Sequence, residues 1–228
     1  RAGNPVTTNG CLPRGAYTPE AFARQQEKIA AAINGLGTSV VALEEIENSE
    51  KFGLDRDHAL AHLVEALNAQ AGEQRWAFVA SPTVRPALAD EDVIRSAFIY
   101  QPAEVTPVGE SVILDDQTNF DNAREPMAQL FRAADGTSEG AAGTDFVAIT
   151  NHFKSKGGSG ATGGNVDAGD GQGAYNADRV GQAEALVAFA ERMKAETGTD
   201  RVLLMGDFNA YETVSYTHLR AHETDSYL

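Results

Sequence analysis

Short apolar runs with the character of buried strands recur along this chain, and they limit its fold more than any other feature. They are rich in β-branched and aromatic residues and are separated by polar, glycine- or proline-containing turns. The expected strands cover residues 39–48, 76–81, 93–100, 104–114, 127–133, 145–153 and 201–208. Strands of this kind must be covered by other layers, so the sequence predicts two packed sheets with helices outside them.

Three segments have helical periodicity, and each is expected to bury one apolar face. The first begins with Thr18 as N-cap and Pro19 at the first helical position, and the third spans residues 176–198. The expected faces are Phe22, Ile29 and Ile33 in the first, Leu60, Leu63, Val64 and Leu67 in the second, and Val180, Ala183, Val187 and Ala190 in the third. We therefore predict one mixed α/β domain.

Length and charge narrow the class of protein. The chain has 228 residues and a formal net charge of −15, which argues against a broad, non-specific grip on nucleic acid. It does not argue against an enzyme in which a metal ion and a few cations handle phosphate locally. The single cysteine, Cys11, excludes an internal disulfide and a cysteine-based zinc site.

Polar side chains stand at the ends of three expected strands, in residues 44–48, 152–156 and 207–209. Side chains alternate along a strand, so residues two apart share a face. The expected groupings are Asp207 with Asn209, His152 with Lys154 and Lys156, and Glu45 with Val41 and Leu43. Functional groups gather at strand ends because the sheet holds them rigidly while loops give access.

The residue types at these ends suit metal-assisted hydrolysis of a phosphate ester. The carboxylates of Glu45 and Asp207 are hard oxygen donors, which suit Mg²⁺ or Mn²⁺ rather than zinc. His152 can donate to a phosphoryl oxygen or act in acid–base catalysis. Asn209 can orient a water molecule or a phosphate oxygen, and the two lysines can meet phosphate charge.

Each of these residues also has a plainer interpretation when it is taken alone. An acidic residue after a strand is commonly a solvated turn residue, and Gly-Asp-Phe-Asn is commonly a turn. A single histidine is more often structural than catalytic, and lysines after a strand are mostly solvated. The recurrence of polar groups at three strand ends is what favours a site.

Four segments resemble the endonuclease/exonuclease/phosphatase superfamily in content and order. They are LEEIEN (43–48), IRSAFIYQP (94–102), NHFKSKGG (151–158) and GDFNAY (206–211). The wording of the third segment, together with REPMAQLF (124–131) and NADR (176–179), is most similar to the secreted bacterial nuclease branch. The resemblance runs from about residue 17 to residue 212.

The resemblance implies a four-layer α/β/β/α sandwich and a nuclease that uses Mg²⁺ or Mn²⁺, with Ca²⁺ as a structural ion in some members. Its substrate would be DNA, or RNA, and its location extracellular or periplasmic. By matching position, Glu45 would bind the metal, His152 would contact the scissile phosphate, Asp207 would direct the attacking water and Asn209 would hold the phosphate. Arg95 and Tyr100 lie in the matching middle motif and, with Lys154 and Lys156, would bind the phosphate of the substrate.

A glycine-rich segment separates the third strand end from the last helix. Within it, residues 167–173 could bind Ca²⁺ through Asp167, Asp170 and backbone carbonyls, although the spacing is not that of an EF-hand. The other interpretation is a mobile surface loop over the substrate groove, which long glycine-rich loops favour.

The last residues differ from everything before them. The stretch VSYTHLRAHET, which starts at Val214, resembles the conceptual translation of a transposase-type sequencing adapter, so we expect residues 214–228 to be read-through and the domain to be residues 1–213. His218 and His222 are therefore not expected to form a metal site. The first strand and the terminal Ser-Asp-His-type motif of the superfamily are not in the printed sequence, so we expect impaired activity.

Two other functions remain open at the level of sequence. The same superfamily contains lipid phosphodiesterases and inositol-phosphate phosphatases, and a fold does not fix a substrate. A non-catalytic binding domain is the second alternative. The presence together of Glu45, His152, Asp207 and Asn209 argues against it, because a decayed site is expected to lose at least one of them.

Overall fold

The computed structural model describes residues 16–134, 144–157 and 160–210. The helices are α1 (Pro19–Asn34), α2 (His58–Ala71) and α3 (Asn176–Thr197), with short 3-10 turns η2 (Ser49–Phe52) and η3 (Gly163–Asn165). The strands are β1 (Val40–Glu47), β2 (Ala77–Phe78), β3 (Ile94–Tyr100), β4 (Val105–Ile113), β5 (Arg124–Ala133), β6 (Asp145–His152) and β7 (Val202–Asp207). Cys11 and residues 214–228 lie outside the described residues, so the expected domain boundary stays a prediction.

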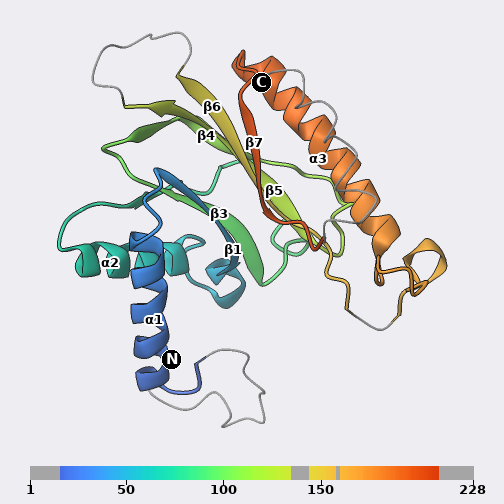
Figure 1. The fold of residues 1–228 in the computed structure, drawn as a ribbon, viewed down its shortest axis with the longest axis horizontal. Helices are drawn as coiled ribbons and strands as arrows, with labels where there is room; N and C mark the ends of the chain where they lie inside the picture. The colour runs from blue at the N-terminus through green and yellow to red at the C-terminus, as the bar shows by residue number, and fades with distance from the viewer. Residues whose placement is uncertain (1–15, 135–143, 158–159, 211–228) are drawn as a thin grey trace.

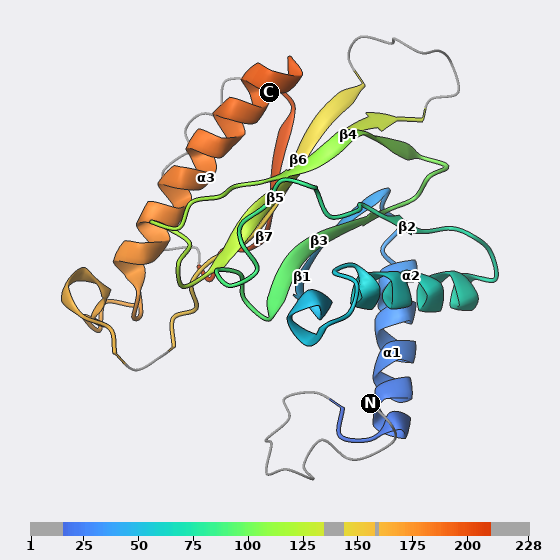
Figure 2. The ribbon, with the colours of Figure 1, turned by 180° about the vertical axis from the view of Figure 1, so that it is seen from behind.

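The described strands form two sheets, as expected. The three-stranded sheet has the order β1-β3-β2 and the four-stranded sheet has the order β4-β5-β6-β7. The pairing of β6 with β7 is parallel and the other pairings are antiparallel. Figures 1 and 2 show α1 and α2 beside the smaller sheet and α3 beside the larger one.

Three apolar clusters show how these layers are stacked. One lies between the two sheets and includes Phe98 of β3, Phe131 of β5 and Ala148 of β6. A second joins α1 and α2 to the smaller sheet, and a third joins α3 to the larger sheet. The order of layers is therefore helix, sheet, sheet, helix, which is the sandwich expected from the sequence.

The N-terminus of α1 is formed as its sequence predicts. The Thr18 hydroxyl accepts a hydrogen bond from the Ala21 backbone N–H at 3.2 Å, and Pro19 occupies the first helical position. The hydroxyl thereby satisfies one of the backbone donors that lack a partner at a helix start. The helix ends at Asn34, immediately before Gly35, whose backbone N–H donates to the last carbonyls of the helix.

The expected apolar faces of α1 and α3 are confirmed only in part: Ile33 and Ala190 are buried, and Val180 and Ala183 pack against the cluster that contains Ala190. In α1 the buried residues are Ala30 and Ile33, which pack in one cluster with Leu60, Val64 and Leu67 of α2, whereas Phe22 and Ile29 are exposed. In α3 the buried face is Arg179, Gln182, Leu186, Phe189, Ala190 and Met193. Two of these side chains are polar and are buried by hydrogen bonds, which a search for apolar periodicity cannot detect.

The buried face expected for α2 is largely confirmed. Leu60, Val64 and Leu67 are buried, and Leu63 packs against the same cluster from a partly exposed position. Among the described residues, no helix is both long enough and apolar enough to cross a lipid bilayer.

Candidate active site

The adjacent ends of β6 and β7 bring two of the expected catalytic residues together. His152 and Asp207 are register partners in this parallel pair. The His152 Nε2 atom lies 3.8 Å from the Asp207 Oδ2 atom. The imidazole is almost completely buried, while the carboxylate is about half exposed. One sheet edge therefore presents a sheltered base and an accessible acid side by side.

Gly206 allows β6 and β7 to approach closely just before the site. Its φ is 126°, and a Cβ atom at this position would lie 2.0 Å from the Asn151 backbone oxygen. No other residue type fits there without moving one strand. The Asn151 side chain also donates to the Met205 carbonyl at 2.6 Å. The glycine thus fixes the spacing that places His152 beside Asp207.

Asn209 fixes the Asp207 carboxylate from the other side. Its φ is 46°, in the left-handed region, and its backbone N–H donates to Asp207 Oδ1 at 2.8 Å. Its side-chain amide donates to the Phe153 carbonyl at 3.0 Å. A non-glycine residue in this conformation is strained, and such strain is commonly found at functional sites.

A bulge in β1 places the expected metal-binding residue. The register with β3 shifts between Leu43 and Ile46, and Glu45 has a φ of 60°. The expectation that Glu45 shares the face of Leu43 was wrong, because the bulge interrupts the alternation and Ile46 occupies that face. Glu45 is instead exposed at the end of its strand.

Glu44, in the smaller sheet, contacts the larger sheet at this site. Its Oε1 atom accepts a hydrogen bond from the Thr150 hydroxyl of β6 at 3.0 Å. Burial raises the pKa of the Glu44 carboxyl, and the negative charges of Asp207 and Glu45 raise it further. The Asp207 and Glu45 carboxylates therefore both lie within electrostatic reach of Glu44, at the junction of the two sheets.

The surroundings of His152 favour its neutral form. Burial lowers the pKa of the imidazole, and the positive charge of Arg124 lowers it further. Asp207 and Glu45 oppose this shift without reversing it. Among the described residues, the buried Nδ1 atom has no hydrogen-bond partner. At neutral pH the ring is therefore available as a base or as a neutral donor.

Arg124 is a site residue that the sequence reasoning did not single out. It is the first residue of β5 and the register partner of His152, although the strand was expected to begin only at Met127. The register of β5 shifts between Arg124 and Met127. Because the shift interrupts the alternation of side chains, the alternating pattern does not reveal where the strand begins. The REPMAQLF segment, which begins at this arginine, was the available indication.

The two lysines that follow β6 turn toward α3. The Lys154 Nζ atom lies 4.7 Å from the centre of the Tyr175 ring, and its backbone N–H donates to Gln182 Oε1 at 2.9 Å. The Lys156 Nζ atom lies 3.5 Å from the Gly171 carbonyl oxygen. Both cations therefore lie beside the glycine-rich segment.

The structure does not bring Arg95 or Tyr100 into the same group. The Arg95 guanidinium is buried and donates to Asp57 Oδ1 at 2.7 Å. Tyr100 pairs with Val40, at the opposite end of β1 from Glu45, and lies between the two sheets beside Phe131. Their expected roles in phosphate binding stay predictions that this geometry does not support.

The donors present suit a hard divalent cation. Glu45 and Asp207 offer carboxylate oxygens, and a bound cation would offset the negative charges that, after burial, raise the pKa of Glu44. Among the described residues, no group of three or more His, Cys, Asp or Glu side chains is arranged to hold a metal ion. Mg²⁺ commonly uses one or two carboxylates and keeps several water ligands, so this donor set fits it.

The glycine-rich segment is tied to the start of α3. Arg179 is fully buried and donates to the carbonyls of Gln172, at 2.8 Å, and Lys154, at 3.1 Å. Asp167 and Asp170 each accept a backbone N–H from the residue two positions later, at 2.9 Å. These are local turn bonds, so the Ca²⁺ site and the mobility of this segment stay predictions.

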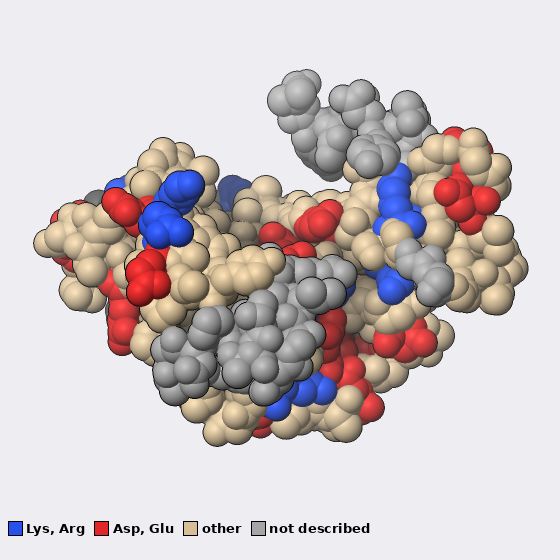
Figure 3. Space-filling view, turned by 90° about the horizontal axis from the view of Figure 1, so that it is seen from below, with Lys and Arg blue, Asp and Glu red and all other residues tan. Residues whose placement is uncertain are grey.

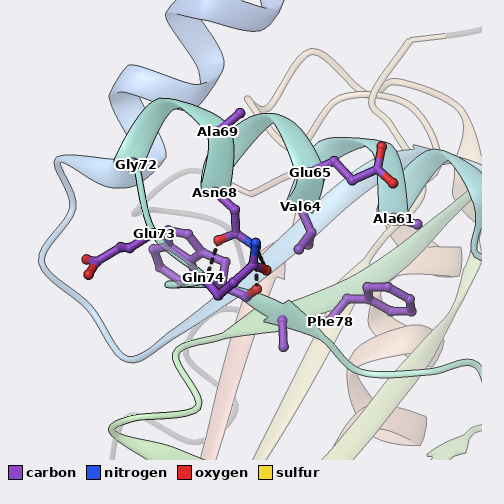
Figure 4. Close-up of a pocket in the computed structure, with 11 residues that line it drawn as sticks. Ala61, Val64, Glu65, Asn68, Ala69, Gly72, Glu73, Gln74 and Phe78 are labelled. Carbon is purple, nitrogen blue, oxygen red and sulfur yellow. Dashed lines mark hydrogen bonds between the residues drawn. The ribbon is translucent and has the colours of Figure 1, made fainter.

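The large cavity of about 770 Å³ beside α2 and β2 is lined by none of the candidate site residues Glu45, His152 and Asp207. Figure 4 shows its Asn68 side chain pointing toward Gln74, and the amide donates to the Gln74 side chain at 3.2 Å and to the Trp76 carbonyl at 2.9 Å. β2 pairs with the Tyr100 end of β3, away from the bulge in β1. This cavity therefore opens at the other end of the smaller sheet.

Solved structures share this arrangement of layers. No protein-family model and no curated protein sequence matches the chain. An endonuclease/exonuclease/phosphatase family protein from Bacteroides thetaiotaomicron is 16% identical with a TM-score of 0.53, over 92% of this chain and 65% of that chain. A conserved protein of unknown function from Enterococcus faecalis V583 is 15% identical with a TM-score of 0.53, over 87% of this chain and 64% of that chain.

The catalytic domain of human Nocturnin, solved with a bound sulfate anion, is 15% identical with a TM-score of 0.50, over 86% of this chain and 60% of that chain. The chain thus spans 60% to 65% of the length of these three structures. The chain has the fold of the endonuclease/exonuclease/phosphatase family, as its motifs predicted. At these identities the likeness establishes the fold alone, so activity must be argued from the site.

Proposed function

We propose that this chain is part of a divalent-metal-dependent phosphodiesterase that hydrolyses DNA. The observation that carries the proposal is the meeting of His152 and Asp207 at one sheet edge with the bulged Glu44–Glu45 pair of the other sheet. Strained backbone at Glu45 and Asn209 accompanies this meeting of charges. Together they give a base, a water-directing carboxylate and a metal-binding carboxylate, which is the equipment of phosphate-ester hydrolysis.

Each residue can be given one task. Asp207, held by the Asn209 N–H, would orient the attacking water with its exposed oxygen. His152, neutral at pH 7, would donate to or exchange a proton with a phosphoryl oxygen. Glu45 would hold Mg²⁺ or Mn²⁺, which when bound supplies Lewis-acid polarisation of the phosphoryl group.

The cations near the site would receive the remaining phosphate charge. Arg124 lies beside His152, and Lys154 and Lys156 lie where the chain leaves β6. Figure 3 shows Lys and Arg side chains lying among Asp and Glu side chains on one face, without an extended basic surface. The proposal therefore assigns phosphate recognition to a few local groups, consistent with a net charge of −15.

Two further expectations belong to this proposal. The residues of the NHFKSKGG segment favour the secreted nuclease branch, and with it an extracellular or periplasmic location. The alternative substrates are a sphingolipid or an inositol phosphate. The polar strand ends suit any phosphate ester, and only the wording of the motifs favours nucleic acid.

The test is a single-turnover assay with the 228-residue chain in excess over substrate, because low activity is expected. The substrates are supercoiled plasmid DNA, single-stranded RNA, sphingomyelin vesicles and an inositol phosphate, each with Mg²⁺, with Mn²⁺ and with EDTA. We expect nicking of the plasmid that EDTA abolishes. Faster hydrolysis of the lipid or of the inositol phosphate would replace the nuclease by that alternative.

A non-catalytic binding domain would give a different result in the same assay. Such a domain would hydrolyse none of the four substrates. It would also bind Mn²⁺ equally well with and without the Glu45→Ala substitution. The nuclease proposal requires instead that Glu45→Ala removes both the nicking and the Mn²⁺ binding.

A further inference from the structure

The position of Arg124 beside His152 needs an explanation, because the backbone alone does not fix it. Arg124 begins β5, and the register with β6 shifts between it and Met127. Its side chain is 20% exposed. Within the described part of the chain, neither its Nη1 nor its Nη2 atom is hydrogen-bonded. A long side chain in such a setting would ordinarily sample several rotamers.

Asp92 holds the guanidinium from the opposite sheet. It lies two residues before β3, and its Oδ2 atom is 3.0 Å from Arg124 Nε. The N–H is not aligned for a hydrogen bond, so the contact is an ion pair, and it is made through Nε rather than through the outer nitrogens. The Oδ1 atom accepts the Val93 N–H at 2.6 Å, which fixes the orientation of the carboxylate.

The backbone of Asp92 is itself anchored to the end of β1. The fully buried Asn48 donates from its side chain to the Asp92 carbonyl at 3.2 Å and to Glu91 Oε2 at 3.0 Å. Its backbone N–H donates to the Val93 carbonyl at 2.8 Å. Arg56 pairs with Glu91, so both charges of this buried pair are balanced. The segment 91–93 is therefore rigid before it reaches Arg124.

The buried charges around Asp92 have an energetic cost that a contribution to folding stability does not explain. Buried ionic groups such as Arg56 and Glu91 rarely stabilise a fold more than apolar residues would. Asp92 adds negative charge within the electrostatic reach of His152, where a polyanionic substrate would be repelled. A carboxylate at such a place is expected to have a compensating role. Its one cationic contact among the described residues is Arg124.

We propose that Asp92 is a positioning residue, which holds the Arg124 guanidinium beside His152 so that its outer nitrogens face the phosphate of the substrate. The inference rests on the proposed function, and it adds to that function a residue outside the motifs' catalytic set. Asp92 touches no substrate. It acts through Arg124, and the buried Asn48 anchor makes its position independent of the ligand.

The first arm of the test measures the motion of Arg124 without any reaction. In ¹⁵N-labelled protein, the Arg124 Nε–Hε resonance is assigned by its loss in Arg124→Lys, and its heteronuclear NOE is measured. We expect a rigid value in the unsubstituted chain, a mobile value in Asp92→Asn, and a rigid value in the matched control Asp90→Asn. An equally rigid Arg124 in Asp92→Asn would overturn the proposal.

The second arm separates positioning from charge. If Asp92 were only a nearby negative charge, Asp92→Asn would tighten binding of plasmid DNA and would not slow its cleavage. We expect instead a fall in kcat of about 100-fold, the cost typical of a misplaced catalytic contact, with partial recovery in Asp92→Glu. The double variant with Arg124→Gln should be no slower than Arg124→Gln alone, since both changes remove one interaction. Additive losses would overturn the proposal.

The two arms also keep the two claims apart. If the unsubstituted chain hydrolyses no phosphodiester, the proposed function fails, while the NMR arm still decides whether Asp92 holds Arg124. If the chain is active and Arg124 is mobile in every variant and in the unsubstituted protein, the positioning role fails and the nuclease proposal stands.

Discussion

Two polar clusters lie side by side near the end of β1, and they balance their charges in different ways. In the first, Arg56 pairs with Glu91 and Arg95 pairs with Asp57, and all four side chains are largely buried. Each cation of this paired cluster faces a carboxylate, and the neighbouring backbone and side chains accept further hydrogen bonds, although the buried Arg95 Nε atom has no partner among the described residues. Nothing in its geometry leaves a charge available to a ligand.

The second cluster, at the ends of β1, β6 and β7, is not balanced. Burial raises the pKa of Glu44, and the negative charges of Asp207 and Glu45 raise it further. His152 is buried with an Nδ1 atom that has no partner among the described residues. Glu45 also takes a left-handed backbone conformation. This unbalanced cluster has unfavourable energy that a metal ion and a phosphate could relieve.

The difference teaches how structural charge can be told from functional charge in one small region. Buried groups that are all paired serve the fold, and their loss should show in stability. Groups held unpaired or strained serve a ligand, and their loss should show in activity while stability changes little or improves. Asp92 joins the two clusters, since its backbone is anchored in the first and its carboxylate faces Arg124 in the second.

The largest effect should come from the base of the unbalanced cluster. His152→Ala should lower the single-turnover rate of plasmid cleavage by about 10³-fold, the usual contribution of acid–base catalysis. The midpoint of thermal unfolding should change little. His62→Ala is the control, because His62 is exposed on α2. Equal rates for the two variants would remove His152 from the mechanism.

The paired cluster should respond in the opposite way. Glu91→Gln leaves the buried Arg56 without its counter-charge, and we expect a loss of about 3 kcal/mol in the free energy of unfolding. Urea unfolding followed by circular dichroism measures this, with the exposed Glu73→Gln as control. A loss no greater than that of the control would show that this cluster is not structural.

Glu44→Gln should raise the free energy of unfolding at pH 7. The amide keeps an acceptor for the Thr150 hydroxyl and removes a carboxylate whose pKa burial has raised. Since the folded pKa lies above 4.5, the carboxyl favours folding below pH 4.5, and this advantage is lost as pH rises through the folded pKa. The gain over the unsubstituted protein should therefore vanish at low pH, and a gain that persists there would contradict this cause.

The smallest effect concerns the titration of His152, followed by NMR of its ring protons. Removing the Arg124 charge by Arg124→Gln should raise the pKa of His152, and Asp207→Asn should lower it. Because the folded pKa lies below 6.5, His152 should cost stability as pH falls from 6.5 toward the folded pKa. Shifts of the same sign in both variants would contradict the charge arrangement described.

Much of this arrangement could be predicted from local sequence. The N-cap Thr18, the strand runs and the polar strand ends follow from propensity and periodicity, and His152 and Asp207 meet as expected. Glu45 lies near the end of its strand as expected, but the direction of its side chain was not predictable. Alternation assumes regular strands, and a bulge with a φ of 60° breaks that assumption.

Other parts needed the assembled structure. Arg124 and Asp92 belong to segments far apart in sequence, and only the packing of two sheets brings their charges to 3.0 Å. The buried face of α3 contains Arg179 and Gln182, whose hydrogen bonds go to backbone groups outside the helix. Long-range polar partners leave no periodic pattern in a single sequence.

The most direct test of the central claim is plasmid nicking by three forms of the chain in Mg²⁺. The forms are the unsubstituted protein, Asp207→Asn and Asp200→Asn, which makes the same charge change at an exposed position before the other end of β7. The account predicts that the unsubstituted protein and Asp200→Asn nick the plasmid at the same rate while Asp207→Asn does not. Equal rates in all three forms, or no nicking by any of them, would contradict it.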